Sequence, residues 1–271
     1  MDLHPVWEVT LRVYGPIAVE RTIRLNEPKG FRLEDPFYSD IIIKPRSQNG
    51  IEAVVTAFAS NENLAYKAAL LFFGQMLDVL AFRINQPLFL SFSDSYQPRN
   101  ATGSYTTRRR VIRQDISDAF RESRLLALVE PVFLRSLGWY RKGLYTEDPF
   151  DKFVAFWNSI ENVTSHYHPP IPDDRPPGSK SQMWESFKKI WGECDKWPII
   201  GGQNDWIDTN NAIRNEIAHG AKSVNIEAVE NVLDKMEPIK KVAYRFLVDW
   251  REKELNPTVP PELQGIYGYR E

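Results

Sequence analysis

The sequence predicts a two-part fold, an α+β N-terminal domain over residues 1–113 followed by an all-α helical bundle over residues 114–255. Before residue 113, apolar and polar residues alternate in several short segments, which is the period of a strand with one buried face. From Asp115 onward, apolar residues recur at spacings of three and four, the period of an amphipathic helix. The last residues, 256–271, contain three prolines and are expected to form an irregular C-terminal tail.

The N-terminal domain begins with its clearest strand, residues 7–13, where four apolar residues alternate with three polar ones in WEVTLRV. Further strand candidates are residues 21–25, 40–44, 51–59 and 87–92. Before the last of these, Asn61 or Asn63 can cap a helix with a broad apolar face. That face consists of Leu64, Ala68, Leu71, Phe72, Gln75, Leu77, Leu80 and Ala81. Its most apolar stretch, Ala68–Phe82, is too short to span a bilayer and contains Asp78, so we expect a buried helix and no membrane segment.

The segment from residue 91 to residue 114 is loop-like at first and basic at its end. Arg108, Arg109 and Arg110 are candidates for contacts with RNA phosphates, and Tyr96 and Tyr105 for stacking on bases. The alternative is a solvated linker, or an edge strand that its charges protect from pairing with another chain.

The C-terminal half is expected to be helical with short breaks. Asp115 can cap its first helix, and Pro131 either kinks that helix or ends it. Later helices are expected from near Pro149, over SQMWESFKKIWGE, after a cap at Asp205, and over residues 226–255, with a proline-rich break at 168–178. The last helix carries an apolar stripe of Val229, Val232, Leu233, Met236, Ile239, Val242, Phe246 and Trp250.

The composition excludes some classes of protein without selecting one. A net charge of −2 over 271 residues gives no global attraction to nucleic acid, so any polyanion site must be a local patch. The single cysteine, Cys194, excludes a disulfide framework and suits a reducing compartment. The N-terminus lacks a basic stretch followed by an apolar run, so we expect a cytoplasmic protein. His166 and His168 have spacing that suits a metal ligand pair, but no third ligand is near, so a loop or RNA-contact role is preferred and no metal or cofactor is expected.

The stretch AIRNEIAHG, residues 212–220, combines features of a helix end with residues that a helix end does not need. Ile213 and Ile217 lie one turn apart and face a core, and Gly220 is a usual helix terminator. Arg214 and Asn215 are not explained in this way. Asn215 and His219 share one helix face, whereas Arg214 and His219 are about 140° apart. A single helix therefore presents the pair poorly, and two copies about a twofold axis are the natural way to form one cleft.

Such a cleft suits RNA cleavage without a metal. A 2′-hydroxyl that attacks the neighbouring phosphate needs a proton acceptor or donor near neutrality, which histidine supplies. Negative charge builds on the phosphate oxygens, and a guanidinium can hold them with paired hydrogen bonds.

The residues Arg214, Asn215 and His219 match the R-x(4–6)-H motif of the HEPN superfamily, and RNEIAHG resembles its Apea-like and MauJ-like branch. The resemblance covers roughly residues 115–255. It implies a HEPN helical bundle that dimerises and, in active members, a metal-independent endoribonuclease that leaves a 2′,3′-cyclic phosphate. Arg214 and His219 would be the catalytic pair and Asn215 a polar helper. Many members serve as toxins or in antiviral defence, with RNA and at times a protein partner or antitoxin as binding partners. In toxins silenced by a nucleotidyltransferase a tyrosine follows the histidine by two, and here that residue is Ala221.

Glu161 lies on the apolar stripe of its helix, where a carboxylate is costly unless it is paired. Arg214 is the expected partner, whose guanidinium Glu161 would orient. Alternatively, Glu161 lies at the edge of the stripe and is solvated. For the whole chain, two alternatives to catalysis also remain: a non-catalytic accessory protein that binds RNA, nucleotide or protein, and a purely structural dimer.

Overall fold

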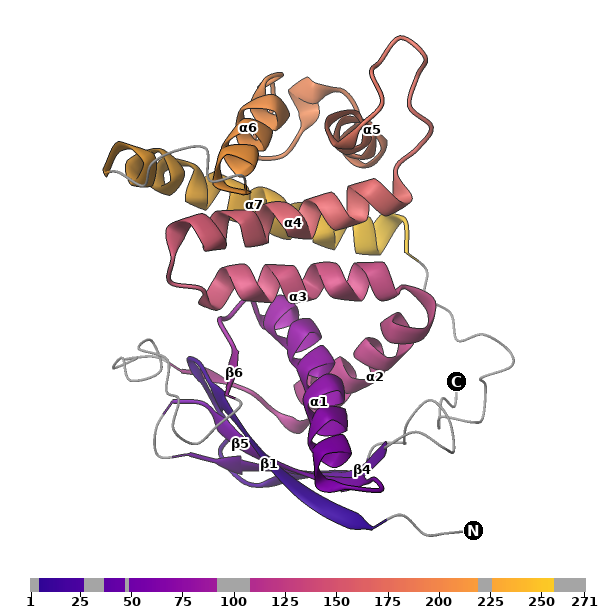
Figure 1. The fold of residues 1–271 in the computed structure, drawn as a ribbon, viewed down its shortest axis with the longest axis vertical. Helices are drawn as coiled ribbons and strands as arrows, with labels where there is room; N and C mark the ends of the chain where they lie inside the picture. Colours follow the sequence, from indigo (N-terminus) through magenta and orange to yellow (C-terminus); the bar gives the residue numbers. More distant parts are fainter. Residues whose placement is uncertain (1–4, 27–36, 47–48, 92–107, 219–225, 256–271) are drawn as a thin grey trace. The chain divides into compact units, whose positions relative to one another are not determined.

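The computed structural model describes residues 5–26, 37–46, 49–91, 108–218 and 226–255 (Figure 1). The chain divides into two compact units, and among the described residues the first contains those up to Leu128 and the second those from Val129 onward. The structure shows the predicted order, a mainly stranded N-terminal part followed by a helical C-terminal part. The predicted boundary after residue 113 coincides with the start of a helix, α2, that belongs to the first unit. The expected tail, 256–271, lies outside the described residues.

The first unit contains a five-stranded antiparallel sheet in the order β3-β4-β5-β1-β6. The strands are β1 (Val6–Tyr14), β3 (Ile23–Asn26), β4 (Phe37–Pro45), β5 (Ile51–Phe58) and β6 (Phe89–Ser91). Each corresponds to a predicted strand segment. Leu11, Ala53 and Ile43 lie in one cross-strand row and are fully buried, so one face of the sheet forms core. The short strands β2 (Ile17–Ala18) and β7 (Arg109–Arg110) form a separate parallel pair.

Helix α1 (Glu62–Ile84) packs on this sheet (Figure 1). Asn61 caps it as predicted, because its side chain accepts a hydrogen bond from the Leu64 backbone N–H at 3.0 Å. Leu64 and Leu71, which were expected on the buried face, are instead 38% and 54% exposed. Within the described residues, α1 is the one helix long and apolar enough to cross a membrane by length and composition. Because 56% of its most apolar window is buried inside the protein, it has the features of a core helix.

Helix α2 (Arg113–Val129) also packs in the first unit. Phe120 of α2 meets Phe73 of α1 with ring centroids 6.0 Å apart, and Arg83 of α1 forms an ion pair with Glu122 at 3.3 Å. Asp115 was expected to cap this helix, but it lies within the first turn and accepts from the Ile112 N–H at 3.0 Å. The helical period was predicted correctly, but it does not say which unit a helix packs against.

The second unit is an all-α bundle in which α4 lies at the centre and contacts α3, α5, α6 and α7 (Figure 1). The helices are α3 (Pro131–Tyr145), α4 (Pro149–Tyr167), α5 (Ser179–Trp191), α6 (Trp206–Ala218) and α7 (Ile226–Lys253). Pro131 starts a new helix, since proline is favoured in a first turn, and therefore ends the preceding helix rather than kinking it. On α7, Leu233 was expected on the apolar stripe but is 53% exposed.

A tight helix contact inside this unit gives a stability prediction. A Cβ at Gly143 of α3 would lie 2.7 Å from the ring of buried Phe156 on α4. We therefore expect Gly143→Ala to lower the free energy of unfolding by about 1–3 kcal/mol, because overpacking outweighs the gain in helix propensity. Urea unfolding followed by circular dichroism measures this.

The matched control is Gly74 in α1, where an added Cβ meets nothing within 4 Å. Gly74→Ala should raise stability by up to about 1 kcal/mol, since alanine is the better helix former. Two alanine variants with equal, favourable effects would show that the contact between Gly143 and Phe156 is not tight.

Candidate functional site

Helix α6 carries the candidate site residues at its C-terminal end. Its buried residues, Trp206, Ile207, Asn210 and Ile213, recur at helical spacing and fix the rotation of the helix. Asp205 precedes the helix, and its backbone carbonyl accepts from the Thr209 N–H at 2.8 Å. Arg214 follows Ile213 and therefore lies at the edge of the buried face, with its side chain 30% exposed.

Arg214 is held by one carboxylate and one amide. Its Nη2 donates to Oε2 of Glu161 on α4 at 3.2 Å, and its Nη1 donates to Oδ1 of Asn215 at 3.1 Å. The Glu161 side chain is 19% exposed, so the structure shows the expected pairing and not a solvated carboxylate. Partly exposed ion pairs contribute little to stability, so the main effect of this contact is to fix the guanidinium.

Two tryptophans position the helices that bear this pair. Trp157 of α4 is fully buried, and its ring centroid lies 6.2 Å from the ring centroid of Trp206 on α6. Glu161 comes one turn after Trp157 on the same side of α4. The aromatic contact therefore sets the position of α6 against α4, and the pair of Glu161 with Arg214 forms further along both helices.

The guanidinium of Arg214 keeps unused donors. Of its five N–H groups, two take part in the bonds to Glu161 and Asn215. The Nε atom is buried and has no hydrogen-bond partner among the described residues. Because Nε is buried, the donors left for a ligand are the second N–H groups of Nη1 and Nη2.

The third predicted member of the site, His219, lies outside the described residues, as do Gly220 and Ala221. The described part of α6 ends at Ala218. The distance between Arg214 and His219 and the contribution of a second copy therefore stay predictions. The structure brings together Arg214, Asn215 and Glu161.

The arginine cluster of residues 108–110 belongs to the first unit, whereas Arg214 belongs to the second. Arg108, Arg109 and Arg110 are all exposed, and the last two form strand β7. Arg110 lies 2.7 Å from Glu20, with both side chains over 60% exposed. One of the three cations is therefore partly compensated, and RNA contact by this cluster stays a prediction.

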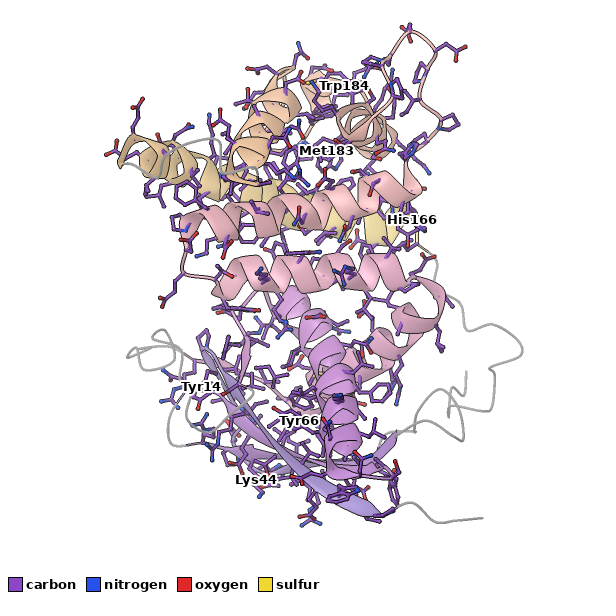
Figure 2. All side chains as sticks on the ribbon, viewed as in Figure 1. Tyr14, Lys44, Tyr66, His166, Met183 and Trp184 are labelled. Carbon is purple, nitrogen blue, oxygen red and sulfur yellow. The ribbon has the colours of Figure 1, made fainter. Side chains whose placement is uncertain are left out.

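The two candidate histidines differ in how they are held. His166 is exposed in the last turn of α4 (Figure 2) and meets the Tyr167 ring edge-on, with ring centroids 4.5 Å apart. His168 Nδ1 lies 2.7 Å from the Pro169 carbonyl, which can only accept, so Nδ1 donates and Nε2 is left to accept from Gln182 at 3.2 Å. Because both of its ring nitrogens are engaged, His168 ties the proline-rich segment to α5, a structural role that sequence reasoning missed.

In the part of the chain that the structure describes, other reactive side chains do not form a second candidate site. Among the residues that the structure describes, no three His, Cys, Asp or Glu side chains come together as metal ligands. Cys194 is buried, and burial raises the pKa of its thiol, so the sulfur is poorly suited to act as a nucleophile.

Comparisons with protein-family models, with curated proteins and with solved structures found nothing that matches this chain. Membership of the HEPN superfamily therefore stays a prediction from the sequence motif.

Proposed function

We propose that this protein is a metal-independent endoribonuclease of the HEPN type that acts as a homodimer. In this proposal Arg214 and His219 of both copies line one cleft, and Asn215 assists. The observation that carries the proposal is the geometry of Arg214: its guanidinium is partly exposed, is held between Glu161 and Asn215, and keeps one further N–H on each of Nη1 and Nη2.

The proposed reaction is transesterification of RNA. The 2′-oxygen attacks the adjacent phosphorus while His219 of one copy takes its proton. The bond from phosphorus to the 5′-oxygen breaks, and a protonated His219, from the same or the other copy, gives that oxygen a proton. The products are a 2′,3′-cyclic phosphate and a 5′-hydroxyl, so no water, metal or oxidant is consumed.

The arginine would stabilise the charge that develops on the phosphate oxygens. A fixed guanidinium needs no reorganisation when the charge appears, which is the basis of electrostatic stabilisation in enzymes. Glu161 offsets part of the positive charge, so its favourable effect is to hold the orientation and not to strengthen the field. Glu161 is therefore a positioning residue.

The proposed setting is the cytoplasm, with RNA as substrate and a role as a toxin or in antiviral defence. A protein partner or antitoxin would then control the activity, because uncontrolled RNA cleavage damages the host cell.

Cleavage of labelled RNA in EDTA tests the proposal. Wild-type protein should cut RNA with EDTA present and leave 2′,3′-cyclic ends, while His219→Ala should lose about 10²–10⁴-fold in rate, the usual contribution of a positioned acid or base. Equal cleavage by both proteins, or no cleavage by either over many RNAs, would contradict the proposal. Tight binding without turnover would favour the non-catalytic binding protein instead.

A mixed dimer examines the shared cleft. Arg214→Ala and His219→Ala chains, each strongly slowed alone, should cleave faster when refolded together, because one cleft then holds an intact Arg214 and an intact His219. Recovery of no activity, in a mixture shown to contain mixed dimers, would place the pair within one chain.

A further inference from the structure

Helix α3 carries a partly exposed tryptophan, Trp139, with two cations of the same helix over its ring. Trp139 lies at the border of the buried side of α3, one turn before Gly143, which contacts Phe156 of α4, and it is partly exposed. Arg135 and Lys142, four residues before and three after Trp139, come to the same side. The Arg135 Cζ lies 6.0 Å and the Lys142 Nζ 5.2 Å from the centroid of the Trp139 ring.

These two cations differ from other cations that lie over tryptophans in the second unit. Arg175 lies over Trp184 but is paired with Glu185 at 3.4 Å. Lys189 lies over Trp250 but is paired with Glu254. Neither Arg135 nor Lys142 has a carboxylate partner among the residues described. Helix α3 therefore combines an aromatic ring with two positive charges that no carboxylate of the described residues compensates.

We propose that Arg135, Trp139 and Lys142, here called the α3 cationic face, bind single-stranded RNA. On binding, Arg135 and Lys142 turn from the Trp139 ring to phosphates on either side of it, and the uncovered ring stacks on one base. This combination of a stacking ring and cations that follow the backbone is how proteins bind single strands without reading their sequence. On the same helix, Arg141 lies 5.8 Å from the centroid of the Tyr145 ring, so a second aromatic side chain with a cation lies close by.

The α3 cationic face is separate from the proposed cleavage site. Helix α3 lies on one side of α4 and α6, which carries Arg214, on the other (Figure 1). The face would therefore hold RNA at a distance from the cleft and favour longer substrates. The choice of RNA as ligand rests on the proposed function; the binding itself does not need cleavage.

Binding of a labelled single-stranded 2′-O-methyl RNA, measured by fluorescence anisotropy, tests this inference. The blocked 2′-oxygen prevents cleavage, and use of the Arg214→Ala background removes the arginine of the proposed catalytic site. In this background Trp139→Leu should weaken binding about tenfold, while Trp139→Phe keeps most of the affinity because phenylalanine still stacks. In the double variant Arg135→Gln, Lys142→Gln, the plot of the log of the binding constant against log salt should become less steep by about 1.4, or about 0.7 for each lost phosphate contact.

The matched control is Arg175→Gln, which removes a cation from a tryptophan face where a carboxylate compensates it (Trp184, Figure 2). It should leave both the affinity and the salt slope unchanged. Three results would each contradict RNA binding by the α3 cationic face: no binding by the Arg214→Ala protein, an unchanged affinity of Trp139→Leu, or an equal loss of affinity in Arg175→Gln. None of these results bears on cleavage by wild-type protein, so the two proposals can fail separately.

Discussion

Arg214→Ala is expected to slow RNA cleavage about 10²–10³-fold, the usual cost of removing one donor that stabilises a charged transition state. The free energy of unfolding should fall by no more than about 1 kcal/mol, because the ion pair with Glu161 is partly exposed. Single-turnover cleavage rates and urea unfolding of the same preparation measure both quantities. A large effect on rate with a small effect on stability is the result that distinguishes a catalytic arginine from a structural one.

Arg175 provides a closely matched control. Its pair with Glu185 spans 3.4 Å with the arginine side chain 34% exposed, whereas the pair of Arg214 with Glu161 spans 3.2 Å with the arginine 30% exposed. Arg175→Ala should therefore cost a similar amount of stability and leave the cleavage rate unchanged. If both variants cleave at the wild-type rate, or slow to the same degree, Arg214 has no special role.

Strands β1 and β3 were predictable because each alternates between a buried and an open face. In β1, Leu11 and Val13 point to the core while Thr10 faces outward, a pattern visible in the sequence. The partner of a helix is not encoded in this way. The period of α2 predicts its apolar side, but only the contact of Phe120 with Phe73 shows that it belongs with the sheet. The exposure of Leu71 and Leu233 has the same origin, since an apolar residue at helical spacing is buried only where another element covers it.

The ion pair of Glu161 with Arg214 was predictable from the free-energy cost of placing a carboxylate on an apolar helix face. A carboxylate on an apolar stripe needs a partner, and Arg214 was the arginine left unexplained by its own helix. The hydrogen bonds of His168 could not be predicted, because Gln182 meets it across a proline-rich segment whose path the sequence does not specify. The α3 cationic face has a weak sequence signal, an arginine and a lysine at four and three residues from a tryptophan. That signal gains meaning only when both cations are seen to lack a carboxylate.

The position of α6 against α4 leads to the largest expected effect on stability. Trp157 is fully buried and contacts Trp206, so Trp157→Ala should lower the free energy of unfolding by about 3–5 kcal/mol, the usual cost of removing a large buried aromatic side chain. Trp157→Phe should cost much less, because it keeps most of the apolar volume and removes an indole N–H that has no partner among the described residues. Thermal and urea unfolding of the three proteins measure these differences.

The same substitution connects packing with catalysis, and Phe133 provides the comparison. Phe133 of α3 is also fully buried, so Phe133→Ala should lower the free energy of unfolding by a similar amount, about 3–5 kcal/mol. However, Phe133 lies on a helix that bears neither Glu161 nor Arg214. At a low temperature where both variants remain folded, Trp157→Ala should cleave RNA at least about tenfold more slowly, because a shift of about 1 Å in a catalytic group can cost 10²-fold. Phe133→Ala should cleave at nearly the wild-type rate. Equal rates in the two variants would show that the contact of Trp157 with Trp206 does not position the arginine, and that its bonds to Glu161 and Asn215 are sufficient to hold it in place.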